Sequence, residues 1–171
     1  EMENFNNTMY SPSFEHDACG MGFITQIDGK ASHELIERAL IMLKRMNHRG
    51  GTGSEPDTGD GAGILFAMPD NFFRTYANKK KINLPAFGEY AVGMFFLPQK
   101  QSEKEAMLSS IEDEVSDAGF RVIGARDVPY VYESCGPTAQ KTMPGFEQII
   151  IGKPFDIAPG REYEDALFRL R

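Results

Sequence analysis

The sequence contains no tryptophan, two cysteines and three histidines, and its acidic residues outnumber the basic ones by 25 to 18. The net charge of -7 argues against a nucleic-acid partner, because proteins that bind nucleic acids present a basic surface to the phosphates. Its apolar runs stay well below the roughly 18 residues that a membrane-spanning helix requires. The acidic, amide-rich start of the chain also lacks the basic and then apolar segments of a secretory signal. We therefore expect a cytoplasmic protein without a membrane partner.

The two cysteines, Cys19 and Cys135, lie far apart in the sequence. They could form a disulfide, but a single bridge would be unusual in a chain of this size. Reduced thiols in a cytosolic protein are the simpler interpretation. Neither cysteine belongs to a CxxC pair, and the three histidines follow no usual zinc-ligand spacing. The sequence therefore predicts no metal site.

The hydrophobic pattern predicts one α+β domain, and 171 residues with 41% apolar side chains suffice for its core. Residues 1–18 are polar and aperiodic, so we expect an extended arm there. Ser32 is suited to cap a helix that runs to about Asn47. Further helices are expected from 69, at 102–118 and from 162. Strands are expected at 64–68, 90–97, 120–128, 146–151, and at 20–27 before the turn signal Asp28-Gly29.

Between residues 50 and 63 the sequence reads GGTGSEPDTGDGAG, which is rich in glycine and almost without apolar side chains. Such a stretch favours a loop that uses glycine's access to positive φ angles. It lacks the Gly-Lys-Ser/Thr ending of a phosphate-binding P-loop, and it follows a helix where a P-loop follows a strand. Asp57 and Asp60 do not match the alternate-position ligands of a calcium loop. The pattern predicts a loop without assigning it a ligand.

Cys19 and Arg49 are the two single residues that are the strongest candidates for a catalytic or binding role. A thiol attacks only as a thiolate, and an N-terminal cysteine could use its own α-amine as the base. In the printed sequence, however, the nitrogen of Cys19 is an amide to Ala18. A buried, unreactive cysteine is the alternative, and Arg49 could equally be a cation at a helix C-terminus. Residue types alone leave both alternatives open.

Two segments carry a family resemblance: FEHDACGMGF at 14–23 and LKRMNHRGGTGSEPDTGDGAGIL at 43–65. Together they resemble the start of the glutamine amidotransferase domain of glutamate synthases, over about residues 10–73. A Cys-Gly start followed by HRG is shared by class II amidotransferases in general. The EHDA leader and the long DTGDGAG loop narrow the resemblance to glutamate synthases.

The resemblance implies a four-layer αββα sandwich of the N-terminal nucleophile hydrolase type, incomplete in this chain. Residues 1–18 would be a removable leader, and 19–171 the first portion of the amidotransferase domain. Cys19 would then be the catalytic nucleophile that hydrolyses L-glutamine through a thioester. The resemblance further implies that the substrate is bound by Arg49 and by a set of loop residues, namely Gly50, Gly51, Thr52, Asp60 and Gly61.

The same resemblance implies that the released ammonia aminates 2-oxoglutarate at a second site, in the rest of the glutamate synthase chain or its subunits. No cofactor is expected in this segment, whereas FMN and an iron–sulfur cluster are implied for the complete enzyme.

Class II domains use an Asn-Gly pair as an oxyanion hole and a later aspartate that holds the glutamine α-amine. This sequence departs from that pattern, because it contains no Asn-Gly pair and the resemblance assigns none of its residues to that aspartate. We therefore expect the chain to be a fragment that is inactive by itself, since losing such a hole costs on the order of 10²–10³ in rate. Another class II amidotransferase is one alternative, and the long loop argues against it. The other alternative is an inactive or regulatory module that retained the fold.

Overall fold

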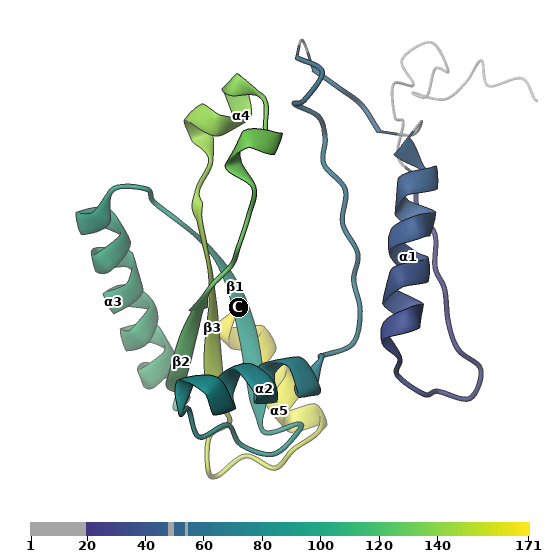
Figure 1. The fold of residues 1–171 in the computed structure, drawn as a ribbon. Helices are drawn as coiled ribbons and strands as arrows, with labels where there is room; N and C mark the ends of the chain where they lie inside the picture. The colour runs from purple at the N-terminus through teal and green to yellow at the C-terminus, as the bar shows by residue number, and fades with distance from the viewer. Residues whose placement is uncertain (1–19, 48–49, 54) are drawn as a thin grey trace, which may run out of the picture. The chain divides into compact units, whose positions relative to one another are not determined.

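The computed structural model describes residues 20–47, 50–53 and 55–171 (Figure 1). The chain divides into two compact units. The first comprises the chain up to Phe66 together with Gly136–Thr138, and the second comprises Ala67–Cys135 and Ala139–Arg171. The expected arm at 1–18 lies outside the described residues. Each unit is described by itself below.

The first unit contains helix α1, His33–Arg45, at the place that the sequence predicts. The Ser32 side chain accepts a hydrogen bond from the Leu35 backbone N–H at 3.3 Å, which confirms the expected cap. Acidic Glu34 in the first turn and basic residues in the last turn complement the helix dipole. One face of α1 is half-buried and apolar, and it consists of Leu35, Ile36, Ala39, Met42, Leu43 and Met46.

The strands predicted at 20–27 and 64–68 are wrong, because neither segment has regular structure. A strand is stabilised by a paired neighbour, and neither segment has a ladder partner among the described residues. The side chains of 20–27 are exposed, so the apolar character that predicted a strand is not buried in this unit. The turn at Asp28-Gly29 is confirmed, since Gly29 N–H donates to the Gln26 carbonyl at 3.1 Å.

The second unit is built on a three-stranded antiparallel sheet with the strand order β1-β3-β2. Its strands are β1, Tyr90–Leu97, β2, Arg121–Asp127, and β3, Gly145–Gly152. All three were predicted from their apolar and β-branched composition. A register shift between Val122 and Gly124 marks a bulge in β2.

Helices cover both faces of this sheet (Figure 1). Helices α3, Gln101–Asp117, and α5, Arg161–Leu170, contribute to a core with Ile149 and Ile151 of β3. Helix α2, Asp70–Lys80, contributes Phe73 to a second core with Tyr90 and Ile150. The alternation of Ile149, Ile150 and Ile151 between the two cores follows from the two-residue period of a strand.

Two short elements were not predicted: the 3₁₀ turn η3, Tyr132–Ser134, and helix α4, Pro137–Thr142. Helices this short give too few residues for a hydrophobic period to be recognised. The Gln140 side chain stabilises the segment by donating to the carbonyls of Tyr132, at 3.1 Å, and Cys135, at 2.8 Å. Cys135 is a half-buried free thiol.

The mixed helix and sheet character confirms the coarse fold class. Within the described ranges the named strands form a single sheet, so the four-layer sandwich stays a prediction. None of the helices in the described part of the chain combines the length and the apolar character needed to cross a membrane.

Candidate functional site

The predicted nucleophile Cys19, the predicted substrate ligand Arg49 and the leader 1–18 lie outside the described residues. The other predicted site residues belong to one loop of the first unit. The structure brings Gly51, Thr52 and Asp60 together in this loop, with Gly50 and Gly61 next to them in sequence.

The loop forms a narrow hairpin, which the sequence analysis predicted only as irregular structure. The Asp60 N–H donates to the Gly51 carbonyl at 3.1 Å, and the Gly53 N–H donates to the Thr58 carbonyl at 2.8 Å. Thr52 and Gly59 form an antiparallel bridge between these two bonds. The hairpin thereby fixes the backbone on which Gly51, Thr52 and Asp60 are carried.

Two glycines suit this shape. A Cβ atom added at Gly51 would lie 2.5 Å from the Asp60 Oδ2 atom, so the carboxylate of Asp60 lies directly beside the Gly51 backbone. Gly61 has a φ of +82°, a conformation that L side chains rarely adopt. Glycine is therefore needed at position 51 because the two sides of the hairpin approach closely there. It is needed at position 61 because the backbone takes a positive φ where the chain leaves the hairpin.

Glu55 attaches the hairpin to the segment Gly136–Thr138 of the same unit. Its Oε1 atom accepts from the Thr138 hydroxyl at 2.6 Å. Its Oε2 atom accepts from the Thr138 N–H at 3.1 Å and from the Thr58 hydroxyl at 2.8 Å. The Thr138 hydroxyl, then the Thr138 N–H and then the Thr58 hydroxyl lower the pKa of Glu55, against a smaller opposing effect of burial.

Sequence reasoning missed Glu55 and Thr138 as partners. The two residues are 83 positions apart, and no local pattern connects them. The segment Glu55-Pro56-Asp57-Thr58 does carry a turn signal, because proline favours the second position of a turn. That signal could have predicted the hairpin tip but not its partner.

The chemistry available in the hairpin is that of binding rather than of nucleophilic attack. It presents backbone N–H and carbonyl groups and the exposed carboxylate of Asp60, without a basic side chain between 50 and 63. An acidic loop of this kind favours a ligand that carries an ammonium group. In the part of the chain that the structure describes, no group of acidic, histidine or cysteine side chains is arranged to hold a metal ion.

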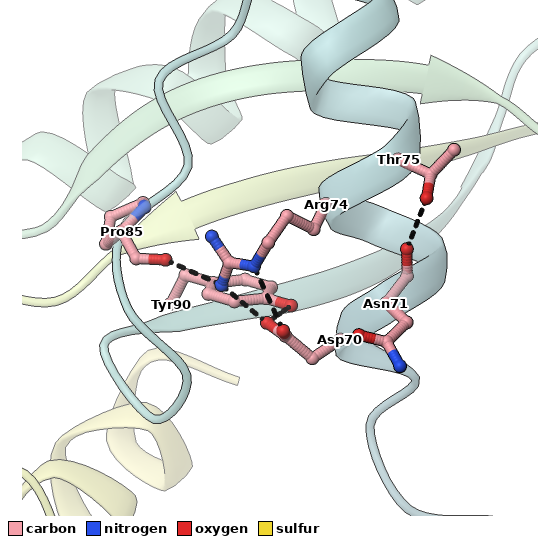
Figure 2. Close-up of polar contacts among 6 residues, drawn as sticks. All are labelled: Asp70, Asn71, Arg74, Thr75, Pro85 and Tyr90. Carbon is pink, nitrogen blue, oxygen red and sulfur yellow. Dashed lines mark hydrogen bonds and ion pairs between the residues drawn. The ribbon is translucent and has the colours of Figure 1, made fainter. Parts of the chain in front are cut away.

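A second polar cluster lies in the second unit, where Asp70 accepts from Arg74 and Tyr90 (Figure 2). Arg74 binds both carboxylate oxygens, at 3.1 and 2.8 Å, and also donates to the Pro85 carbonyl at 3.1 Å. The Arg74 hydrogen bonds hold the pKa of Asp70 below its usual range. Burial, and secondarily Asp70, raises the pKa of Tyr90. These contacts join the start of α2 to the start of β1, which is a structural role.

A groove in the first unit lies between the segment Ile24–Asp28 and the first turns of α1. Its other lining residues are Ser32, Glu34, Leu35 and Arg38. None of Gly50, Gly51, Thr52, Asp60 and Gly61, the predicted substrate-binding residues that the structure describes, lines this groove. The predicted substrate-binding residues that the structure describes lie on or beside the hairpin, which is therefore taken as the candidate site.

Comparison with known proteins shows the class of protein. The family of class-II glutamine amidotransferases matches residues 19–171. The chain belongs to this family.

Individual relatives narrow the similarity to glutamate synthases. The chain is 42% identical, over 95% of its length, to the NADPH glutamate synthase large chain of Bacillus subtilis. It is 40% identical, over 92% of its length, to the ferredoxin-dependent glutamate synthase of Cyanidium caldarium. It is 37% identical, over 80% of its length, to the chloroplastic ferredoxin-dependent glutamate synthase 2 of Arabidopsis thaliana. The aligned part spans 11%, 10% and 8% of these relatives, respectively.

Proposed function

We propose that this chain is the glutamine-hydrolysing segment of a glutamate synthase, which releases ammonia from L-glutamine for the amination of 2-oxoglutarate elsewhere in the complete enzyme. The observation that carries the proposal is the similarity to glutamate synthases along 80–95% of the chain. The electron donor differs between these relatives, one of which is named for NADPH and another for ferredoxin. The electron donor therefore forms no part of the proposal.

Cys19 acts in this proposal as an N-terminal nucleophile after removal of residues 1–18. Its freed α-amine, with a pKa of about 7.7–8 in model peptides, takes the proton of its own thiol. The thiolate attacks the side-chain amide carbon of glutamine, ammonia leaves, and water hydrolyses the γ-glutamyl thioester to glutamate. The family match begins at Cys19, which supports a mature chain that starts at this residue.

The hairpin acts in this proposal as a wall of the glutamine site. The exposed carboxylate of Asp60 lies beside the backbone of Gly51 and contributes a polar group to this wall. Arg49, in the HRG motif, supplies a guanidinium that orders the substrate. Gly50, Thr52 and Gly61 contribute backbone that the absence of bulky side chains leaves accessible.

The domain is completed in this proposal as a four-layer αββα sandwich. On the sheet face that α2 covers only in part, Met94 is 48% and Phe96 is 65% exposed. Phe146 and Tyr130 continue this apolar surface, with ring centroids 5.3 Å apart. A second sheet packed on these side chains would bury them and so gain hydrophobic stabilisation.

FMN and an iron–sulfur cluster would be bound by other parts of the complete enzyme. The two cysteines of this chain are fewer than the cluster ligands that an iron–sulfur site requires, so the residues present do not fit a cluster. A cytoplasmic location is likewise part of the proposal, and one of the relatives is named as chloroplastic.

Thiol labelling in the complete enzyme tests the proposed function. A diazo-ketone analogue of glutamine should label Cys19 and abolish glutamine hydrolysis, because the analogue reaches the activated thiolate. Cys135 provides the internal comparison, and peptide mass mapping reports both residues. Equal labelling of the two thiols, or preferential labelling of Cys135, would contradict the assignment of the nucleophile.

The alternative is an inactive or regulatory module that kept the amidotransferase fold. The intact mass of the purified protein separates the two functions. A chain that begins at Cys19 and hydrolyses glutamine supports the enzyme. A chain that permanently retains residues 1–18 and lacks glutaminase activity supports the module.

A further inference from the structure

Both carboxylate oxygens of Glu55 accept hydrogen bonds within the first unit. Three donors converge on it: the Thr58 hydroxyl from within the hairpin, and the hydroxyl and N–H of Thr138. Both carboxylate oxygens accept hydrogen bonds, at distances between 2.6 and 3.1 Å. Hydrogen bonds to an ionised acceptor are stronger than neutral ones, so these three bonds attach the hairpin tip firmly to the segment Gly136–Thr138.

The backbone of Gly136 provides a second, independent sign of a built contact. Its N–H donates to the Asp57 carbonyl at 3.0 Å. A Cβ atom added at Gly136 would lie 2.7 Å from the Glu55 Oε2 atom and would also collide with the Thr58 hydroxyl. The segment therefore approaches the hairpin as closely as only glycine allows.

We propose that Glu55 is a positioning residue that holds the hairpin in the shape required to receive glutamine. The inference rests on the proposed function of this loop as a wall of the glutamine site. Glu55 acts through the backbone that carries Gly51, Thr52 and Asp60, and it does not itself touch the substrate. Its lowered pKa keeps the carboxylate ionised at neutral pH, as its three donors require.

This role predicts an effect on substrate binding rather than on the chemical step. In the complete enzyme, Glu55→Ala should raise the KM for glutamine about tenfold with kcat changed less than about twofold, as expected for losing a charge-assisted attachment. Glu55→Gln should give a smaller increase. Its amide can still accept from the Thr138 N–H and can donate to the Thr138 hydroxyl.

Asp57→Ala is the matched control in the same hairpin. It removes an exposed carboxylate but keeps the backbone carbonyl that accepts from Gly136, so KM should stay unchanged. Thr138→Val removes one donor to Glu55. Combined with Glu55→Ala, it should raise KM no further than Glu55→Ala does alone, because the two residues act as a unit.

Amide hydrogen exchange gives a readout that does not depend on activity. Exchange at Gly53 and Asp60, whose N–H groups close the hairpin, should be faster in Glu55→Ala and unchanged in Asp57→Ala. Unchanged exchange in Glu55→Ala, or an equal KM increase in Asp57→Ala, would overturn the positioning role. Failure of the unmodified enzyme to hydrolyse glutamine would instead contradict the proposed function, and the exchange result would still decide whether Glu55 holds the hairpin.

Discussion

At the scale of the residue, the carboxylate of Asp70 joins three segments of the second unit. Through Arg74 and Tyr90 it connects the start of α2, the loop at Pro85 and the first residue of β1 (Figure 2). The side chain of Asp70 is 23% exposed, whereas Tyr90 is buried. Loss of the carboxylate would therefore leave a buried hydroxyl without its charged acceptor.

Asp70→Asn should lower the free energy of unfolding by about 1 kcal/mol at pH 7. The folded pKa of Asp70 lies below its ordinary value of 3.8, so the contribution is fully present above pH 3.8. It is lost as the pH falls below this value, through the folded pKa. The difference between the two proteins should therefore stay constant from pH 7 to pH 5 and shrink below pH 3.8, as measured by urea unfolding with circular dichroism.

Tyr90→Phe is the control for this pH dependence, because it removes the hydroxyl and leaves the ion pair between Asp70 and Arg74 in place. Its effect should vary much less between pH 7 and pH 3 than that of Asp70→Asn. A stability loss in Asp70→Asn that remained undiminished at pH 3 would contradict the assigned electrostatic role.

Arg49 carries a second prediction at this scale, which rests on the HRG motif alone. Arg49→Lys keeps the charge but loses the planar, forked geometry that binds a carboxylate through two hydrogen bonds. We expect glutaminase activity to fall by about tenfold or more while the melting temperature is unchanged. If Arg49→Ala instead lowers the melting temperature and leaves the kinetics normal, Arg49 interacts with the end of a helix.

At the scale of the element, the sequence was most informative where a local signal and a buried face coincide. Ser32 and the apolar period predicted α1, and the apolar run at 90–97 predicted β1 with the same bounds. The strand prediction at 20–27 was wrong because apolar side chains form a strand only beside a neighbouring strand, and the described part of the unit supplies none. Strand composition predicts the ability to pair, and the partner is decided by the rest of the molecule.

Tyr163 of α5 has a feature that composition could not predict. It is 3% exposed, and its hydroxyl has no hydrogen-bond partner among the described residues. Burial, with a smaller effect of Glu164, raises its pKa to about 12. Its ring lies 6.2 Å from that of Phe120, so packing rather than hydrogen bonding holds it.

Tyr163→Phe should therefore leave the free energy of unfolding unchanged or raise it by about 1 kcal/mol, because it removes an unsatisfied buried polar atom and keeps the ring. Thermal unfolding followed by circular dichroism provides the measurement. Tyr90→Phe is the matched comparison, since its hydroxyl has the Asp70 acceptor and should cost stability. A clear destabilisation by Tyr163→Phe would show that its hydroxyl has a partner in the complete protein.

At the scale of the whole molecule, the proposed mechanism makes a strict demand on the start of the chain. The nitrogen of Cys19 can serve as a base only when it is no longer part of a peptide bond with Ala18. We expect purified full-length enzyme to begin at Cys19, and we expect Cys19→Ala to retain residues 1–18 if the thiol drives its own processing. Intact mass spectrometry checks both outcomes. Active enzyme with the leader still attached would refute this mechanism.

The site was predictable to a different degree from the fold. Motif resemblance indicated which loop to examine, and the structure places Gly51, Thr52 and Asp60 of that loop on one hairpin. The attachment of Glu55 to Thr138 could not be predicted, because a contact across 83 positions depends on the tertiary path of the chain. The sequence motif thus predicted the loop, whereas its attachment through Glu55 and Thr138 could be found only from the fold.

The strand order β1-β3-β2 also has a consequence for the folding of the second unit during its synthesis on the ribosome. Among the described residues, both outer strands pair only with β3, which is the last of the three to be synthesised. At about 10 residues per second, β1 waits on the order of 5 s for the strand that completes its ladder. By the end of that interval the nascent chain carries two unpaired strands, of which β1 is the apolar one. The exposure of this unit to chaperones and to aggregation is therefore decided by the arrival of β3.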